Sequence, residues 1–142
     1  MTSTDTRPSE TFTAEELSYL RSQRLGRLAT EQPNGTLQVS PVGFSVDPEA
    51  GTIDIHGFRM SASRKFRNIK ENGKVAFVVD DLLSVDPWRV RCLEIRGSAE
   101  SIIVDDIQGG GLIRIHPKRI ISFGIGADLP PHQLRPSTRN VG

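Results

Sequence analysis

The sequence predicts a mainly β fold: an antiparallel barrel of six or seven strands, with one N-terminal and one mid-chain helix. The chain has 142 residues, which suits one domain with its own hydrophobic core. Its apolar residues fall in short runs, several of them alternating with polar residues, as in Thr52–His56. Tight turns rich in Pro, Asn and Gly, such as Gln32–Gly35, separate these runs. Short strands joined by tight turns are typical of small antiparallel barrels.

The first third of the chain is expected to hold a terminal arm, a helix and three strands. Residues 1–11 are rich in Thr and Ser with mixed charge, and we expect a disordered arm there. Thr13 and Glu16 have the spacing of a capping box, which predicts a helix ending near Gln23. Strands are then expected at Leu25–Thr30, Leu37–Val46 and Thr52–His56. Because the turn Asp47–Gly51 is short, the last two strands should form a hairpin.

The rest of the chain is expected to hold a second helix and four strands. Arg59–Asn72 is predicted as one helix with an apolar stripe of Ala62, Phe66 and Ile69. The strands are expected at Lys74–Asp80 (buried on both faces), Val90–Ser101, Leu112–His116 and Arg119–Ile125, with a loop at Asp81–Trp88 and a break at Pro117. The barrel domain would then span residues 12–126, followed by an extended tail over residues 127–142.

Composition restricts the possible functions. The formal net charge is +1, which argues against a protein whose main partner is nucleic acid. The lone Cys92 excludes an internal disulfide and fits a reducing compartment. The sequence shows no apolar run long enough to cross a membrane and no signal peptide, so we expect a cytoplasmic protein without a membrane partner.

The basic segment within the second helix carries the clearest chemical signal. Five cations occur before the first acid, Glu71: Arg59, Arg64, Lys65, Arg67 and Lys70. Ser63 stands near the helix start, where unpaired N–H groups and a partial positive charge favour an anion. With Arg64 and Lys65 beside it, this segment is a plausible phosphate site. The alternative is a solvated basic helix face, although such faces usually mix the two signs of charge.

Other candidate groups carry less chemistry. His56, His116 and His132 lack ligand spacing, so no metal site is expected, although His56 ends the strand beside the basic helix. Cys92 lies within an apolar strand and is not expected to be a nucleophile. Trp88, on a loop, either packs against the barrel or covers a flat ligand. A phosphate site on a barrel without its own catalyst suits a bound cofactor that carries the reaction.

Several segments, in their order and spacing, resemble the pyridoxamine phosphate oxidase-like split β-barrel superfamily. They are Leu25–Thr30, Val39–Phe44, Thr52–Gly57, Ser63–Asn68 and Lys74–Val79. Three further segments resemble its branch that depends on the deazaflavin F420: Asp86–Arg89, Glu94–Gly97 and Ile113–Pro117. The resemblance covers roughly residues 13–126.

The resemblance implies a homodimer with cofactor sites at the subunit interface. It assigns Ser63, Arg64 and Lys65 to the cofactor phosphate, and Trp88 to closing the site, from the same or the partner chain. The strand at Ser40–Val42 would run beside the ring, and the strand end at His56–Gly57 would line the cleft. Together with the basic segment, this gives the cofactor-binding residues that we expect: Ser40, Pro41, Val42, His56, Gly57, Arg59, Ser63, Arg64, Lys65 and Trp88.

The expected function is an F420-dependent reductase that transfers a hydride to an electron-poor conjugated C=C of a small organic substrate. The similarity extends to a subgroup that reduces dehydro-intermediates of tetracycline-type polyketides in antibiotic biosynthesis. The Arg/Trp-rich C-terminal region of true pyridoxamine-phosphate oxidases is missing, which argues against vitamin B6 oxidation. The alternatives are an FMN-binding oxidoreductase of the same fold and a non-enzymatic binder of flavin, haem or nucleic acid. No residue is assigned a catalytic role: the proton would come from solvent or from a polar group such as His56.

Overall fold

The computed structural model describes residues 10–104, 110–126 and 128–142. The expected disordered arm, residues 1–11, lies outside the described residues except for its last two. The described helices and strands are α1 (Ala14–Ser22), β1 (Leu25–Glu31), β2 (Leu37–Gly43), β3 (Ser45–Asp47), β4 (Thr52–His56), the 3₁₀ turn η1 (Met60–Ala62), α2 (Arg64–Glu71), β5 (Lys74–Ser84), β6 (Arg89–Ile103), β7 (Gly111–Phe123), the 3₁₀ turn η2 (Pro131–Gln133) and β8 (Ser137–Asn140).

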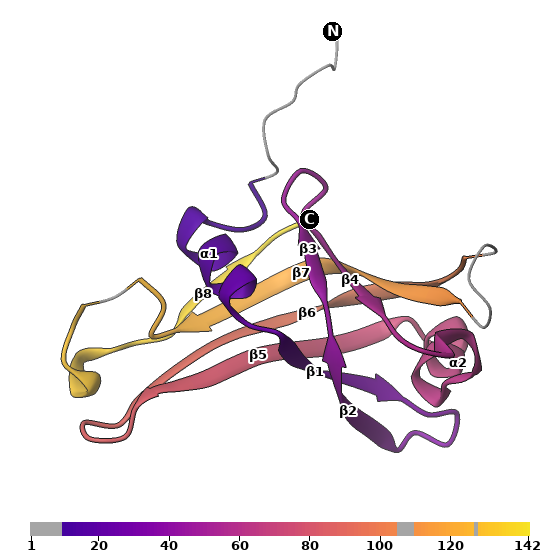
Figure 1. The fold of residues 1–142 in the computed structure, drawn as a ribbon, viewed down its shortest axis with the longest axis horizontal. Helices are drawn as coiled ribbons and strands as arrows, with labels where there is room; N and C mark the ends of the chain where they lie inside the picture. The colour runs from indigo at the N-terminus through magenta and orange to yellow at the C-terminus, as the bar shows by residue number, and fades with distance from the viewer. Residues whose placement is uncertain (1–9, 105–109, 127) are drawn as a thin grey trace, which may run out of the picture.

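One strongly curled antiparallel sheet forms the body of the protein (Figure 1). Its strand order is β2-β1-β5-β6-β7-β4-β3, and β8 adds to β7. The long strands β5, β6 and β7 form the centre, and the curl brings the two ends of the sheet toward each other. Helix α2 lies at one end of the long strands, whereas α1 lies near the opposite end of the molecule (Figure 1). This arrangement is the split β-barrel that the sequence predicts.

The core fills the inside of the curl. Ile53, Ile55, Leu93, Ile95 and Ile113 are each 0% exposed. Because side chains alternate along a strand, these positions place one face of β4, β6 and β7 inward. Helix α2 contributes Phe66 and Ile69 to the same cluster. The burial of this apolar surface is the main force that holds the sheet in its curled form.

Two local predictions from the first third of the chain are confirmed. The Thr13 hydroxyl accepts a hydrogen bond from the backbone N–H of Glu16 at 3.1 Å, and the Glu16 carboxylate accepts one from the N–H of Thr13 at 2.9 Å. Helix α1 therefore begins with a capping box, and it ends at Ser22, with Gln23 as its C-cap. Strands β3 and β4 form the expected hairpin.

The mid-chain helix differs from its prediction. Arg59–Asn72 is not one helix, because Ser63 is extended (φ −77°, ψ 154°) and separates η1 from α2. Ser63 accepts a hydrogen bond from the N–H of Phe66, and this N-cap starts a new helix. Ala62 therefore does not continue the apolar stripe of Phe66 and Ile69, and it is exposed.

Four strand predictions are also corrected. The expected strand Leu37–Val46 divides at Phe44 into β2 and β3. Strand β5 continues to Ser84, into the segment expected to be a loop, because residues 81–84 pair with β6. Within β5, burial alternates between buried and half-buried residues, so the strand is not buried on both faces. Pro117 does not break β7: it pairs with Gly97 beside a register shift, the kind of irregularity at which a sheet tolerates proline.

The C-terminal segment contributes a further strand, which makes eight in the described residues. Strand β8 pairs with the end of β7, from Arg119 to Ser122. From β8, the Arg139 guanidinium donates a hydrogen bond to the carboxylate of Glu16 at 2.8 Å. Glu16 is buried, at 3% exposure. This ion pair ties the end of the chain to α1. None of the described helices is long and apolar enough to span a bilayer.

Candidate cofactor site

A cavity of about 290 Å³ lies where β2, the end of β4 and the start of α2 meet. We call it the β2–β4 cavity, and it is lined by Pro41, Val42, Gly43, His56, Gly57, Phe58, Met60, Ser63 and Lys65. Six of the ten residues that the sequence predicts are among them: Pro41, Val42, His56, Gly57, Ser63 and Lys65. The fold thus brings residues 41–43 of β2 next to a second stretch of the chain, between positions 56 and 65.

The floor of the cavity is formed where β4 turns into η1. Met60 is buried at 2% exposure. A Cβ atom on Gly57 would stand 3.0 Å from the Met60 Cε atom, so a larger residue at position 57 would have to displace Met60. The backbone N–H of Met60 donates to the carbonyl of Gly57 at 3.2 Å and closes a turn around positions 58 and 59. Gly57 therefore leaves room for the end of the Met60 side chain under the cavity.

The start of α2 gives the cavity its charge. No acidic residue lies in the first turn of α2, and the half-buried Lys65 is the one cationic residue of the lining. The lining, as far as the structure describes it, contains no carboxylate. Arg64, Lys65 and Arg67 form no ion pair with any described residue. A cavity with an unpaired ammonium group and a helix N-terminus selects an anion, and a phosphate oxygen fits both.

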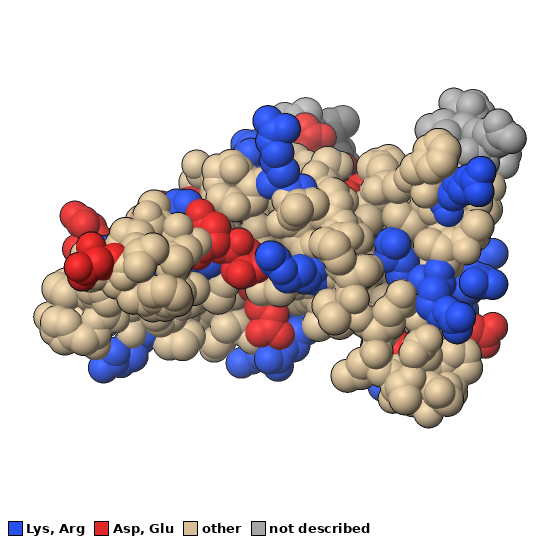
Figure 2. Space-filling model, turned by 60° about the horizontal axis from the view of Figure 1, so that its bottom comes forward, with Lys and Arg blue, Asp and Glu red and all other residues tan. Residues whose placement is uncertain are grey.

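The remaining cations of α2 face away from this cavity. Arg64, Arg67 and Lys70 line a second depression of about 290 Å³, together with Pro33, Asn68 and Glu71. Figure 2 shows Lys and Arg side chains gathered at the end of the molecule where α2 lies. Arg64 and Lys65, which are neighbours in the sequence, therefore lie on different surfaces: Lys65 lines the β2–β4 cavity and Arg64 lines the second depression.

Four predicted residues do not line the β2–β4 cavity. Ser40 precedes Pro41, and its Oγ atom is buried without a hydrogen-bond partner. Arg59 is exposed, and its guanidinium group lies 5.7 Å from the ring centroid of Phe58. Arg64 faces the second depression. Trp88, 61% exposed, lies on the β5–β6 turn at the opposite end of the sheet from α2 (Figure 1), so a role in this cavity would require a second copy of the chain.

Three lining residues were missed by sequence reasoning: Gly43, Phe58 and Met60. Phe58 directly follows the predicted His56–Gly57 strand end, so its position along the chain was a usable signal. Met60 was treated as part of a continuous helix. Because the backbone breaks at Ser63, Met60 instead lies under the cavity, where its Sδ atom is 3.5 Å from the Ser63 hydroxyl.

The buried side-chain amide of Asn68 connects α2 to the sheet. Asn68 is 2% exposed, and its Nδ2 group donates to Thr30 Oγ1 at 3.0 Å and to Gln38 Oε1 at 3.2 Å. These bonds connect α2 to β1 and β2, which carries Pro41 and Val42. The polar side chain of Asn68 interrupts the apolar pattern of the helix, and no local sequence pattern indicates its partners.

A larger cavity, of about 570 Å³, lies elsewhere, beside α1. Tyr19 and Arg91 are part of its lining, and both form hydrogen bonds to Asp81. Arg91 donates two hydrogen bonds to Asp81, at 2.9 and 2.6 Å, and this pairing holds the pKa of Asp81 below its usual value. Burial and the hydrogen bond to Asp81 raise the pKa of Tyr19. These groups satisfy one another, so they tie α1 to the sheet rather than present a reactive centre.

The remaining candidate nucleophile is not activated. Burial raises the pKa of the Cys92 thiol, and the nearby carboxylates of Asp80 and Glu94 raise it further. A thiol with a raised pKa holds little of the nucleophilic thiolate at neutral pH. The sequence-based view of Cys92 as a strand residue agrees with this environment.

The residues of the β2–β4 cavity fit a flavin-like cofactor. Lys65 and the N-terminus of α2 suit a phosphate group, and Pro41 and Val42 on β2 offer apolar contacts to a ring within a lining whose exposed surface is mostly polar. The buried hydroxyl of Ser40, beside Pro41, has no hydrogen-bond partner in the described chain, but it lies outside the lining. A phosphate-bearing ligand with a flat ring meets the two features of the lining.

Comparison with known proteins identifies the family. Residues 12–121 match the pyridoxamine 5'-phosphate oxidase family. The chain is 46% identical, over 123 residues, to a 5a,11a-dehydrotetracycline/5a,11a-dehydrooxytetracycline reductase of Streptomyces rimosus subsp. rimosus, covering 83% of this chain and 87% of that protein.

Two solved structures show the same fold. An F420 reductase is 27% identical with a TM-score of 0.55, and the match covers 68% of this chain and 88% of that one. A haem-binding protein of Mycobacterium smegmatis gives a TM-score of 0.68 at 16% identity, over 96% of this chain and 60% of that one, which shows the fold alone. The predicted resemblance is thereby confirmed, and the chain belongs to the pyridoxamine 5'-phosphate oxidase family of split β-barrels.

Proposed function

We propose that this protein is a reductase that uses reduced F420 to reduce an electron-poor conjugated C=C of a small organic substrate. The observation that carries the proposal is the β2–β4 cavity, where Pro41 and Val42 of β2 share a lining with an unpaired lysine at a helix N-terminus. The similarity to a dehydrotetracycline reductase and to an F420 reductase supports this choice. A dehydrotetracycline-type polyketide is therefore the first substrate class to test.

The chain's own residues would bind, orient and shield the reactants. When bound, reduced F420 supplies a hydride. Lys65 and the N–H groups at the start of α2 would hold the phosphate, and Pro41 and Val42 would support the ring against β2. His56 is the one imidazole of the cavity lining, and one of its ring nitrogens would deliver a proton to the carbon next to the reduced position.

We further propose that the protein works as a homodimer whose second copy completes the site. The β5–β6 turn and its flanks expose four large apolar side chains: Leu82, Leu83, Val85 and Trp88. An exposed apolar group of this size is typical of an interface. The β2–β4 cavity is also open to solvent in one copy, and cover from a partner would exclude water from the reaction.

The test is turnover of a conjugated enone, with a 5a,11a-dehydrotetracycline as the first substrate and reduced F420 as the donor. Reduced FMN serves as the parallel donor. Two results together would support the proposal: oxidation of F420, measured as the return of its absorbance, and a product with two more hydrogen atoms than the substrate. Turnover with reduced FMN but not with reduced F420 would instead assign the cavity to a flavin. Binding of either cofactor without turnover of any enone would favour a carrier.

A further inference from the structure

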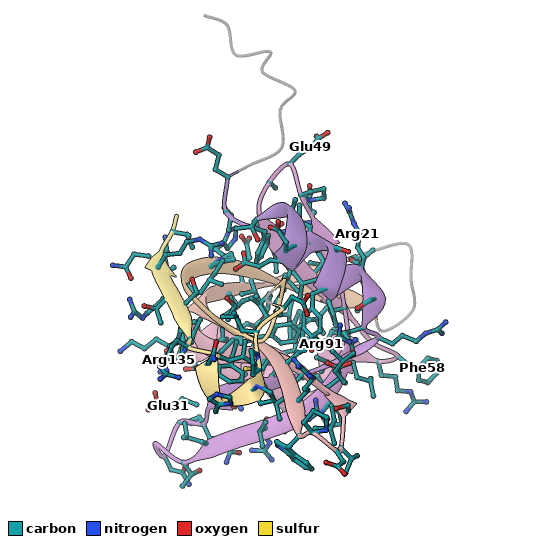
Figure 3. The ribbon with its side chains drawn as sticks, turned by 90° about the vertical axis from the view of Figure 1, so that its left-hand side faces the viewer. Arg21, Glu31, Glu49, Phe58, Arg91 and Arg135 are labelled. Atoms are coloured by element: carbon teal, nitrogen blue, oxygen red, sulfur yellow. The ribbon has the colours of Figure 1, made fainter. Side chains whose placement is uncertain are left out.

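Phe58 is the most exposed large apolar side chain in the described residues, at 93% exposure. It is also part of the lining of the β2–β4 cavity, beside Gly57 and Met60. Figure 3 shows it projecting from the edge of the molecule, away from the ribbon. Single exposed apolar residues are common on proteins, but this one stands at the mouth of the cavity that the proposed function uses.

The backbone fixes the position of Phe58. The hydrogen bond from the N–H of Met60 to the carbonyl of Gly57 closes a turn whose two central residues are Phe58 and Arg59. Arg59 has φ 58° and ψ 37°, and it is the one non-glycine residue with a positive φ in the part of the chain that the structure describes. A left-handed arginine costs free energy, and such conformations persist mainly where the surroundings or a function require them.

The ring of Phe58 has one face already engaged. The Arg59 guanidinium carbon lies 5.7 Å from the ring centroid, within the range of a cation–π contact. The described residues give the ring no second aromatic or cationic contact. One aromatic face therefore remains free at the mouth of a cavity whose far side, at Lys65, suits a phosphate.

We propose that Phe58 is a specificity-determining residue that stacks on the flat ring of the ligand whose phosphate lies at Lys65. This inference rests on the proposed function, because it assumes an occupant of the β2–β4 cavity. Stacking on an aromatic side chain rewards a planar ring system and gives nothing to a non-planar phosphate. Phe58 would thus select a tricyclic cofactor from among the many phosphate-bearing molecules that Lys65 alone would accept.

The experiment compares ligands with and without a ring on the full chain. F420 and FMN, followed by their own fluorescence, report binding of ring plus phosphate, and glycerol 3-phosphate, as a competitor, reports the phosphate site alone. The variants are Phe58→Ala, Phe58→Trp and Lys65→Ala. Leu37→Ala, which removes a side chain 75% exposed on β2 but outside the cavity lining, is the control.

The proposal expects Phe58→Ala to raise the Kd of the ring-bearing ligand about tenfold and to leave competition by glycerol 3-phosphate unchanged. Phe58→Trp should bind as tightly as wild type or more tightly, and Lys65→Ala should weaken both kinds of ligand. A Kd for Phe58→Ala within twofold of the wild-type and Leu37→Ala values would overturn the stacking role. A change of oligomeric state without a change in Kd would overturn it too, because the ring would then be covered by a second copy.

Failure of the proposed function has a different signature. In that case wild-type protein would bind neither F420 nor FMN, and Lys65→Ala would change nothing. That result would remove the occupant of the cavity and the stacking role with it. Unchanged ring affinity in Phe58→Ala, with Lys65→Ala still weakening both kinds of ligand, would remove only the role of Phe58.

Discussion

The hydroxyl group of Ser63 donates a hydrogen bond to the carbonyl oxygen of Met60, with 2.7 Å between the two oxygen atoms. The same hydroxyl accepts a hydrogen bond from the N–H of Phe66 at 3.3 Å. One side chain therefore closes the 3₁₀ turn and caps α2. Because Met60 forms the cavity floor and α2 carries Lys65, Ser63 fixes the geometry between the floor and the cation.

Two substitutions at Ser63 distinguish its role in folding from its role in anion binding. Ser63→Ala removes the N-cap and should lower the free energy of unfolding by about 1 kcal/mol in urea titrations. Ser63→Asp retains a good N-cap, but it places a carboxylate beside Lys65. Because a carboxylate cannot donate to the Met60 carbonyl, Ser63→Asp should recover only part of the stability that Ser63→Ala loses, and we expect it to lose affinity for F420 and for glycerol 3-phosphate. Anion affinity in Ser63→Asp equal to that of wild type would contradict an anion site here.

Lys65 and Lys70 form a matched pair of lysines on α2. Lys65 lines the β2–β4 cavity, whereas Lys70 faces the second depression and lies 5.4 Å from the Phe66 ring centroid. Lys65→Ala should weaken cofactor binding by about 1.5–3 kcal/mol, the usual contribution of a hydrogen bond to a charged group. Lys70→Ala should change the Kd by less than about threefold, because it removes only long-range charge in a screened position. Equal losses in the two variants would assign the affinity to the general charge of the helix.

The predictable part of the structure is what local chemistry decides. The capping box at Thr13 and Glu16 and the β3–β4 hairpin each depend on residues a few positions apart. The grouping of His56, Gly57, Ser63 and Lys65 around one cavity follows from a basic segment placed directly after a strand end, whereas Pro41 and Val42 were expected there only from the family resemblance. These local structures are kept in the folded protein because no tertiary contact opposes them.

The unpredicted part depends on contacts between distant segments. Pro117 is tolerated within β7 only because Gly97 on the neighbouring strand permits a register shift. Asn68 is buried only because Thr30 and Gln38 arrive with hydrogen-bonding groups. Trp88 and the β2–β4 cavity are separated by the length of the sheet, and a single sequence does not show which surfaces a second copy would bring together.

Asn68 is expected to be important for stability. Asn68→Ala leaves the Thr30 hydroxyl and the Gln38 carbonyl without their donor in a region that is largely closed to water. We expect a loss of about 1–3 kcal/mol in the free energy of unfolding. Asn34→Ala, in the exposed β1–β2 turn, is the control, since its bonds to Thr36 lie in solvent. A loss in Asn34→Ala as large as that in Asn68→Ala would argue against a role for burial.

Gly97 is the position where the backbones of β6 and β7 approach most tightly. A Cβ atom there would lie 2.2 Å from the carbonyl oxygen of His116, which is backbone and has little freedom to move. Gly97→Ala should therefore destabilise the fold by about 2 kcal/mol or more, measured by thermal and urea unfolding. Gly43→Ala is the matched control, because its Cβ atom would meet nothing closer than 3.9 Å. Similar unfolding curves for the two variants would contradict the close approach.

Asp81 should make the stability of the protein depend on acid pH. Its hydrogen bonds from Arg91, which act against the effect of burial, hold its pKa in the folded state below the usual value of 3.8. The folded state therefore binds this proton less readily than the unfolded state does. The resulting stabilisation is complete above about pH 4 and is lost as pH falls through the lower folded pKa.

Asp81→Asn tests this dependence. The variant should lose about 1–3 kcal/mol at pH 7, and the difference from wild type should shrink as pH falls below 4. Asp80→Asn is the adjacent control: Asp80 pairs with Arg27, but the two side chains are 44% and 48% exposed, and such pairs contribute little. Urea unfolding of the three proteins between pH 2.5 and 7 gives the comparison. A constant difference between wild type and Asp81→Asn over this range would mean that the carboxylate's charge is not what ties α1 to the sheet.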